Sequence, residues 1–140
     1  MHILRTALCF LAFALASAVP APQPSQNSPV LGADIPSYPP LARGTYIQGK
    51  VEIQIQMGSD GKVISATSRS GHPLLLQAAL DNVKTWRFAP RQGEQIVVYE
   101  FRIDDKKVDE NDPYYRYGKV LFRPPNTVEV IVPPLIMVAN

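Results

Sequence analysis

An alternation of apolar and polar residues at positions 51–57 is the clearest pattern in the chain. Val51, Ile53, Ile55 and Met57 alternate with polar side chains, which is typical of a β-strand with one buried and one solvated face. Residues 58–61 follow as Gly-Ser-Asp-Gly, and glycine adopts positive φ without steric cost. We therefore expect a strand that ends in a tight turn.

A second, weaker strand is expected from Val63 to Ser68, and a helix after it. Pro73 occupies a position suited to the first turn of a helix, where its missing N–H is not needed. Apolar residues then recur at helical spacing: Leu76, Ala79, Leu80, Val83 and Trp86. We expect the residues between them to face water: Asp81, Asn82, Lys84 and Thr85. Pro90 excludes a continuation of the helix.

The segment 95–103 predicts a third strand. Val97, Tyr99, Phe101 and Ile103 fall on one face of it. Beyond it, an acidic loop is expected over 104–113, a strand over 114–122, a turn over 123–126 and a further strand over 127–132. The region 104–140 therefore predicts a β-hairpin appended to the sheet.

The N-terminal flank has a different composition. Residues 1–18 contain an apolar run and end in Ala-Ser-Ala, a pattern typical of a secretory signal cleaved after Ala18. The alternative is an uncleaved membrane anchor, although the run is shorter than the roughly 20 residues that span a bilayer. Residues 19–37 are rich in Pro, Gln and Ser, which predicts a mobile leader. We expect residues 38–43 to form a short helical or turn segment, with Tyr38 and Leu41 in the core.

Charge and reactive side chains favour no catalytic class. The formal charge of +2 is small and no basic run is present, so we expect no nucleic-acid partner. Cys9 is the only cysteine and lies inside the signal. His72 precedes Pro73 and is interpreted as a helix cap or turn residue, and the acidic cluster over 104–112 does not have the spacing of a calcium loop. We therefore expect no metal, no cofactor and no enzymatic activity.

An ordered set of short motifs resembles the C-terminal domain of the energy transducer TonB. The motifs are Tyr38-Pro39, Ala42-Arg43, Gly49-x-Val51, Asp60-Gly61-x-Val63, Ser70-Gly71-His72-Pro73, Ala78-Ala79 and Trp86-Arg87-Phe88-x-Pro90. The resemblance covers residues 38–103. It implies an α+β fold, in which a small antiparallel sheet carries one main helix in the order β-β-α-β. The residues expected to maintain this fold are Tyr38, Pro39, Gly49, Gly61, Gly71, Pro73, Trp86, Phe88 and Pro90.

The resemblance also implies a binding site. In the TonB fold the third strand lies at the edge of the sheet and receives an extended segment of an outer-membrane transporter, the TonB box, as an added strand (β-augmentation). The corresponding residues here are Gln95, Ile96, Val97, Val98, Tyr99, Glu100 and Phe101. The appended hairpin raises a competing hypothesis, because a hairpin that paired with this strand would occupy the same edge.

Three functions follow as hypotheses. The first is a periplasmic interaction module, exported by its signal peptide, whose partner is a TonB-dependent outer-membrane transporter. The second is an energy transducer that keeps its N-terminal anchor in the inner membrane and contacts motor proteins there. The third is a structural protein whose sheet edge pairs with a second copy of itself, as exposed edges also drive dimers.

Overall fold

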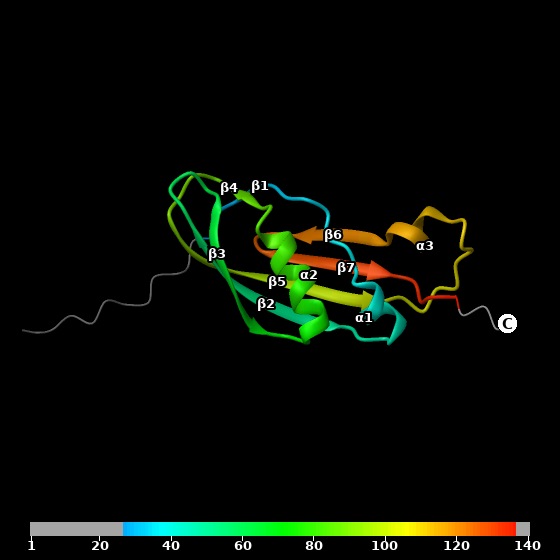
Figure 1. The fold of residues 1–140 in the computed structure, drawn as a ribbon. Helices are drawn as coiled ribbons and strands as arrows, with labels where there is room; N and C mark the ends of the chain where they lie inside the picture. The colour runs from blue at the N-terminus through cyan, green and yellow to red at the C-terminus, as the bar shows by residue number, and fades with distance from the viewer. Residues whose placement is uncertain (1–26, 137–140) are drawn as a thin grey trace, which may run out of the picture.

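A mixed five-stranded sheet with one long helix across one face forms the body of the protein (Figure 1). The computed structural model describes residues 27–136. Its elements are β1 (Val30–Gly32), α1 (Pro40–Gly44), β2 (Gly49–Met57), β3 (Val63–Ser70), α2 (Pro73–Val83), β4 (Arg87–Phe88), β5 (Gly93–Ile103), α3 (Pro113–Tyr117), β6 (Lys119–Arg123) and β7 (Thr127–Val132). The strand order is β3-β2-β5-β7-β6, and β1 pairs separately with β4. The α+β prediction is confirmed.

The β2–β3 hairpin forms as its alternation predicts. Val51, Ile53 and Ile55 are fully buried, and β2 pairs antiparallel with both β3 and β5. Gly61 in the turn has φ 79°, and a Cβ there would lie 2.0 Å from the carbonyl oxygen of Phe88. The position therefore requires glycine for its backbone angle and for its close contact with β4.

Helix α2 begins where the sequence places it. Pro73 occupies the first turn, and Nδ1 of His72 accepts a hydrogen bond from the N–H of Leu74 at 3.2 Å, so the capping role of His72 is confirmed. The buried face is rotated by about one residue from the expected one: the buried residues are Leu75, Ala79, Asn82 and Val83, whereas Leu76 and Leu80 are only half-buried. The prediction that Asn82 faces water is wrong.

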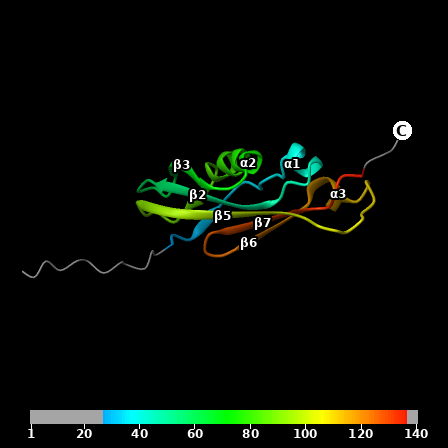
Figure 2. The same cartoon turned by 90° about the horizontal axis from the view of Figure 1, so that it is seen from below.

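The core lies between α2 and the sheet. We call the face of the sheet that α2 covers the helix-side face; Figure 2 shows α1 and α2 on this same side. Tyr38 meets Phe101 edge-on at 5.4 Å between ring centroids, and Trp86 contacts Phe88 and Tyr99. The expected structural residues lie where the motifs place them: Tyr38, Trp86 and Phe88 are buried, and Gly49, Gly61, Gly71 and Pro73 stand at element boundaries.

The N-terminal segment is packed from residue 27 onward. Val30–Gly32 pairs with β4, and the N–H of Asp34 donates to the Thr85 hydroxyl. The mobile leader predicted over 19–37 is therefore wrong for residues 27–37. In α1 the buried residue is Ala42, while Leu41 is exposed, which corrects the expectation that Leu41 belongs to the core. The signal predicted over 1–18 lies outside the described residues.

The C-terminal region forms a hairpin of β6 and β7, preceded by α3. The strand predicted over 114–122 is wrong in its first half: residues 113–117 are helical, because Pro113 starts the turn and the Asp112 carboxylate accepts from the N–H of Tyr114 at 2.8 Å. Arg43 on α1 holds this region through bonds to the carbonyl oxygens of Pro133 and Tyr115. The appended residues are thus packed against the rest of the fold.

Candidate functional site

Strand β5, the expected docking edge, lies inside the sheet. On one flank it pairs with β2 from Gly93 to Phe101. On the other flank β7 runs parallel to it, from Val98 opposite Thr127 to Ile103 opposite Val132. The prediction that Gln95, Ile96, Val97, Val98, Tyr99, Glu100 and Phe101 form an edge is therefore wrong. The physical reason is that the apolar face of the appended hairpin is buried best beside β5, where it extends the core.

The start of the β7 flank is also covered. The carbonyl oxygen of Asn126 accepts from the N–H of Val98 at 2.9 Å, and its side-chain Nδ2 donates to the carbonyl oxygen of Ile96 at 2.7 Å. The side-chain Oε1 of Gln95 accepts from the N–H of Ser28 at 2.9 Å. Strand addition to β5 would thus have to displace contacts made by the chain itself.

The hypothesis that the hairpin pairs with the third strand is confirmed, although the arrangement differs from a simple meander. The connection over 104–126 brings the second hairpin strand, β7, next to β5, and β6 ends the sheet (Figure 1). Val128, Val130 and Val132 on β7 are buried on the helix-side face. This apolar row explains why β7, and not β6, takes the inner position.

Glu129 fixes the three C-terminal strands on the opposite face. Its side chain is 2% exposed. Its carboxylate forms ion pairs with Arg102 of β5, at an N···O distance of 2.5 Å, and with Arg123 of β6, at 2.8 Å. The hydrogen bond from Arg123 holds the pKa of the Glu129 carboxyl below its ordinary value, with a smaller contribution from Arg102. Removal of either arginine would leave this buried carboxylate without one of its partners, which strongly destabilises a folded protein.

Asn82 is the polar centre of the helix-side core. Its Oδ1 accepts from Nε1 of Trp86 at 2.9 Å and from the hydroxyl of Tyr99 at 2.8 Å, and its Nδ2 donates to the carbonyl oxygen of Asp34 at 2.8 Å. Burial raises the pKa of Tyr99. Sequence reasoning missed Asn82; the available signal was its spacing of three and seven residues from Ala79 and Leu75.

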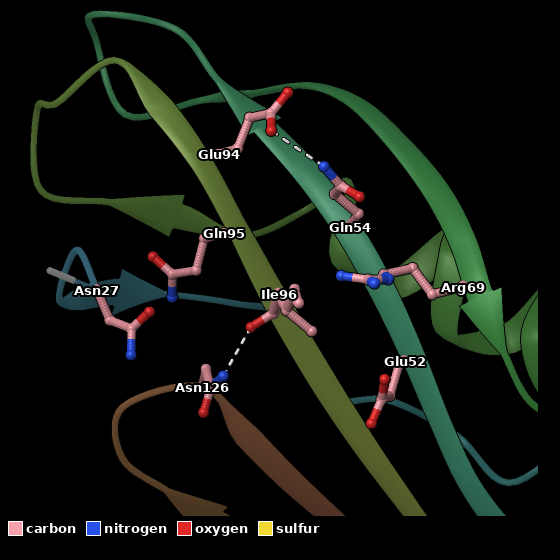
Figure 3. Close-up of a pocket in the computed structure, with 8 residues that line it drawn as sticks. All are labelled: Asn27, Glu52, Gln54, Arg69, Glu94, Gln95, Ile96 and Asn126. Atoms are coloured by element: carbon pink, nitrogen blue, oxygen red, sulfur yellow. Dashed lines mark hydrogen bonds between the residues drawn. The ribbon is translucent and has the colours of Figure 1, made fainter. Parts of the chain in front are cut away.

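A polar notch lies beside the first part of β5 (Figure 3). It has a volume of about 410 Å³ and is lined by Asn27, Glu52, Gln54, Arg69, Glu94, Gln95, Ile96 and Asn126. Gln54 donates to the Glu94 carboxylate at 3.0 Å, while the buried Nε2 of Gln95 has no hydrogen-bond partner. The notch offers hydrogen-bonding groups beside the part of β5 that precedes its ladder with β7.

The strands that end the sheet remain open on one flank. Within residues 27–136, β3 forms a ladder only with β2, and β6 forms a ladder only with β7. Unpaired N–H and C=O groups on such strands are the chemical feature that accepts another strand. The candidate functional site is therefore a sheet edge, and it belongs to β3 or β6.

No group of three or more His, Cys, Asp or Glu residues that could hold a metal ion occurs in the described part of the chain. In the acidic loop, the N–H of Lys106 and the hydroxyl of Tyr114 lower the pKa of Asp104. Burial, reinforced by Asp104, raises the pKa of Tyr114 to about 12. These are the contacts of a structured loop.

Comparison with known proteins places the fold in a family. The family model for the C-terminal domain of the Gram-negative bacterial TonB protein matches residues 35–104, half of the chain. The chain belongs to this family. The resemblance deduced from the motifs over 38–103 is thereby confirmed, and β6 and β7 lie beyond the matched range. No curated protein matches the chain.

Family membership sets a broad functional class. The TonB C-terminal domain is a transport-related, non-enzymatic domain whose members interact with outer-membrane transporters, and TonB-like proteins are periplasmic or anchored in the inner membrane. Between residues 27 and 136, none of the helices is long and apolar enough to span a bilayer. The chain is thus a TonB-like, transport-related interaction module.

Proposed function

We propose that this protein binds an extended segment of a TonB-dependent outer-membrane transporter and adds it as a strand to its sheet. The observation that supports the proposal is the open flank at each end of the five-stranded sheet, in a domain whose family interacts with such transporters. Main-chain groups of the sheet supply the bonds, and neighbouring side chains select the partner.

The expected affinity is modest. Each backbone hydrogen bond contributes about 0.5–1.5 kcal/mol, and the loss of freedom of a flexible peptide offsets much of the total. A micromolar dissociation constant, which corresponds to about 8 kcal/mol, is the expected order. Such a contact is weak enough to be made and released repeatedly.

The proposed location is the periplasm, after export by the signal peptide expected over residues 1–18. The alternative is an energy transducer that retains this segment as an anchor in the inner membrane, next to motor proteins. Mass spectrometry of the protein purified from cells distinguishes the two, because cleavage leaves Val19 as the first residue, whereas an anchored protein retains the segment.

Titration with synthetic TonB-box peptides tests the proposal. We expect one or more of the peptides to bind with a micromolar dissociation constant by calorimetry or NMR, while scrambled peptides of the same composition do not. If every peptide fails to bind at millimolar concentration, transporter binding by this module is refuted. Sedimentation without peptide tests the competing hypothesis of a dimer formed by edge pairing.

A further inference from the structure

Strand β6 combines an open backbone flank with an apolar groove beside it. A groove of about 260 Å³ lies between the N-terminal segment 30–36, Trp86 and the helix-side face of β6 and β7. This segment crosses past β6 on its way from β1 to α1 (Figure 1), and it forms no ladder with β6. A strand added to β6 would therefore place its side chains on this face into the groove.

The walls of the groove are exposed apolar side chains. Phe122 of β6 is 46% exposed and contacts the buried Trp86 ring edge-on at 6.1 Å. Leu31 and Ile35 on the N-terminal segment are 68% and 82% exposed. Large apolar side chains gathered around a hollow are typical of a surface that a partner covers.

The opposite face of β6 is cationic. Lys119 and Arg123 lie on it, and β6 contains no acidic residue. The Arg123 side chain is 63% exposed and shares the buried Glu129 carboxylate with Arg102. Glu100 of β5 is the other acidic group that acts on Arg123. Lys119, Arg123 and Arg102 therefore carry three positive charges here. The carboxylates of Glu129 and Glu100 carry two negative charges, so this face is positive at the outer edge.

The second open strand is less suited to binding. β3 carries one large exposed apolar residue, Ile64, which is 65% exposed. Its other exposed residues are small and polar, such as Ser65 and Thr67, apart from Arg69. The notch that includes Arg69 of β3 is lined mainly by polar side chains, in contrast to the apolar groove beside β6. A strand added to β3 would therefore form backbone hydrogen bonds, but the side chains of β3 would discriminate little between partner sequences.

We propose that β6 is the docking strand, and that its partner is an extended segment in which apolar residues alternate with acidic ones. The apolar residues enter the groove beside Phe122, and the acidic residues face Lys119 and Arg123. This inference rests on the proposed function, which makes the partner a transporter segment. The appended hairpin closes the flank of β5 and supplies a new edge two strands further out.

Amide hydrogen exchange of the whole protein, with and without peptide, locates the docking strand. Two probes are used: the transporter-derived peptides, and a synthetic peptide of alternating Val and Glu. We expect bound peptide to slow exchange over Lys119–Arg123 and to leave Val63–Ser70 unchanged. Protection confined to Val63–Ser70 would overturn the choice of β6 while the proposed function stands.

A pair of charge reversals tests side-chain selection. Lys119→Glu should weaken binding of the Val/Glu peptide by about 3–10-fold. An exposed charge contact contributes up to about 1 kcal/mol, and the reversal adds repulsion. Arg69→Glu on β3 is the matched control and should change the affinity less than twofold. Equal effects of the two reversals would contradict docking at β6.

The remaining outcomes separate the edge from its partner. If the Val/Glu peptide protects β6 but no transporter peptide binds, the edge is correct and the transporter is the wrong partner. If neither probe binds, both proposals are wrong. If β6 becomes protected on raising the protein concentration alone, the occupant of the edge is a second copy of the chain, which overturns the proposed partner.

Discussion

At the scale of single residues, the amide oxygen of Asn82 lies between two aromatic donors, the indole N–H of Trp86 and the hydroxyl of Tyr99. Its Nδ2 joins the same helix to the carbonyl oxygen of Asp34. Asn82, Trp86 and Tyr99 are buried, so water does not replace a partner lost among these three side chains. Asn82 therefore orients the aromatic core and holds the N-terminal segment that borders the groove.

Asn82→Ala is expected to lower the free energy of unfolding by about 2–4 kcal/mol, because it leaves two buried donors and one carbonyl oxygen without a partner. Urea denaturation at pH 7 measures the change. Gln77→Ala is the control on the same helix: Gln77 also bonds through its amide, to Asp81, but it does so at the surface. Equal losses for the two variants would contradict the role of Asn82.

Glu129 predicts a pH dependence. Its carboxyl has a lowered pKa in the folded chain, so between the folded and unfolded pKa values the unfolded chain binds more protons and stability rises with pH. The contribution is complete above the ordinary value of about 4.3 and is lost as the pH falls through the lower, folded value.

Glu129→Gln should therefore unfold at a lower urea concentration than the parent protein at pH 7. The difference in stability should shrink as the pH falls below about 4, because protonation removes the same charge from the parent. Urea titrations at pH 7, 5, 4 and 3 measure both. A difference that stays constant over this range would show that the carboxylate charge is not what stabilises the hairpin.

At the scale of elements, periodicity and capping residues predict most of the central fold. The alternation over 51–57 yields β2, and Pro73 with the His72 cap starts α2. The same signal was present at Asp112 and Pro113, where an aspartate cap precedes a proline, and it starts α3. Tyrosine favours strands, and that preference led to the wrong element over 114–117.

The partners of β5 could not be predicted from local pattern. The 23 residues between β5 and β7 allow the hairpin to return on either side and in either direction, and side-chain alternation is the same in parallel and antiparallel pairs. The three residues of β1 are too few for a periodic signal, and the surrounding prolines indicated a mobile leader. The pairing of β5 with β7 and of β1 with β4 depends on burial in the tertiary structure. A short stretch of sequence does not reveal it.

Gly61 tests how the β2–β3 turn is joined to β4. Gly61→Ala should lower the free energy of unfolding by more than about 1 kcal/mol, because φ is positive and the new methyl would collide with the Phe88 carbonyl. Gly32→Ala is the control, since a Cβ there meets nothing within 4 Å. Thermal unfolding of both variants checks this, and a Gly61 variant as stable as the control would contradict it.

At the scale of the whole molecule, the hairpin extends the family's fold. The matched segment 35–104 ends just after β5, and β7 and β6 continue the sheet beyond it. Arg43 in the matched segment bonds to the carbonyl oxygens of Tyr115 and Pro133 in the extension. The two parts therefore share one sheet and one set of contacts, and the open edge on this side moves from β5 to β6.

Residue-resolved amide exchange in the free, full-length protein tests this displacement of the edge most directly. The N–H of Val98 bonds on the β7 flank, and alternation along the strand places those of Glu100 and Arg102 on the same flank. We predict that these three amides exchange as slowly as that of Ile53 in β2. Exchange as fast as that of the amides on the open flank of β3 would show that β5 is an edge, and the proposed docking at β6 would fail with it.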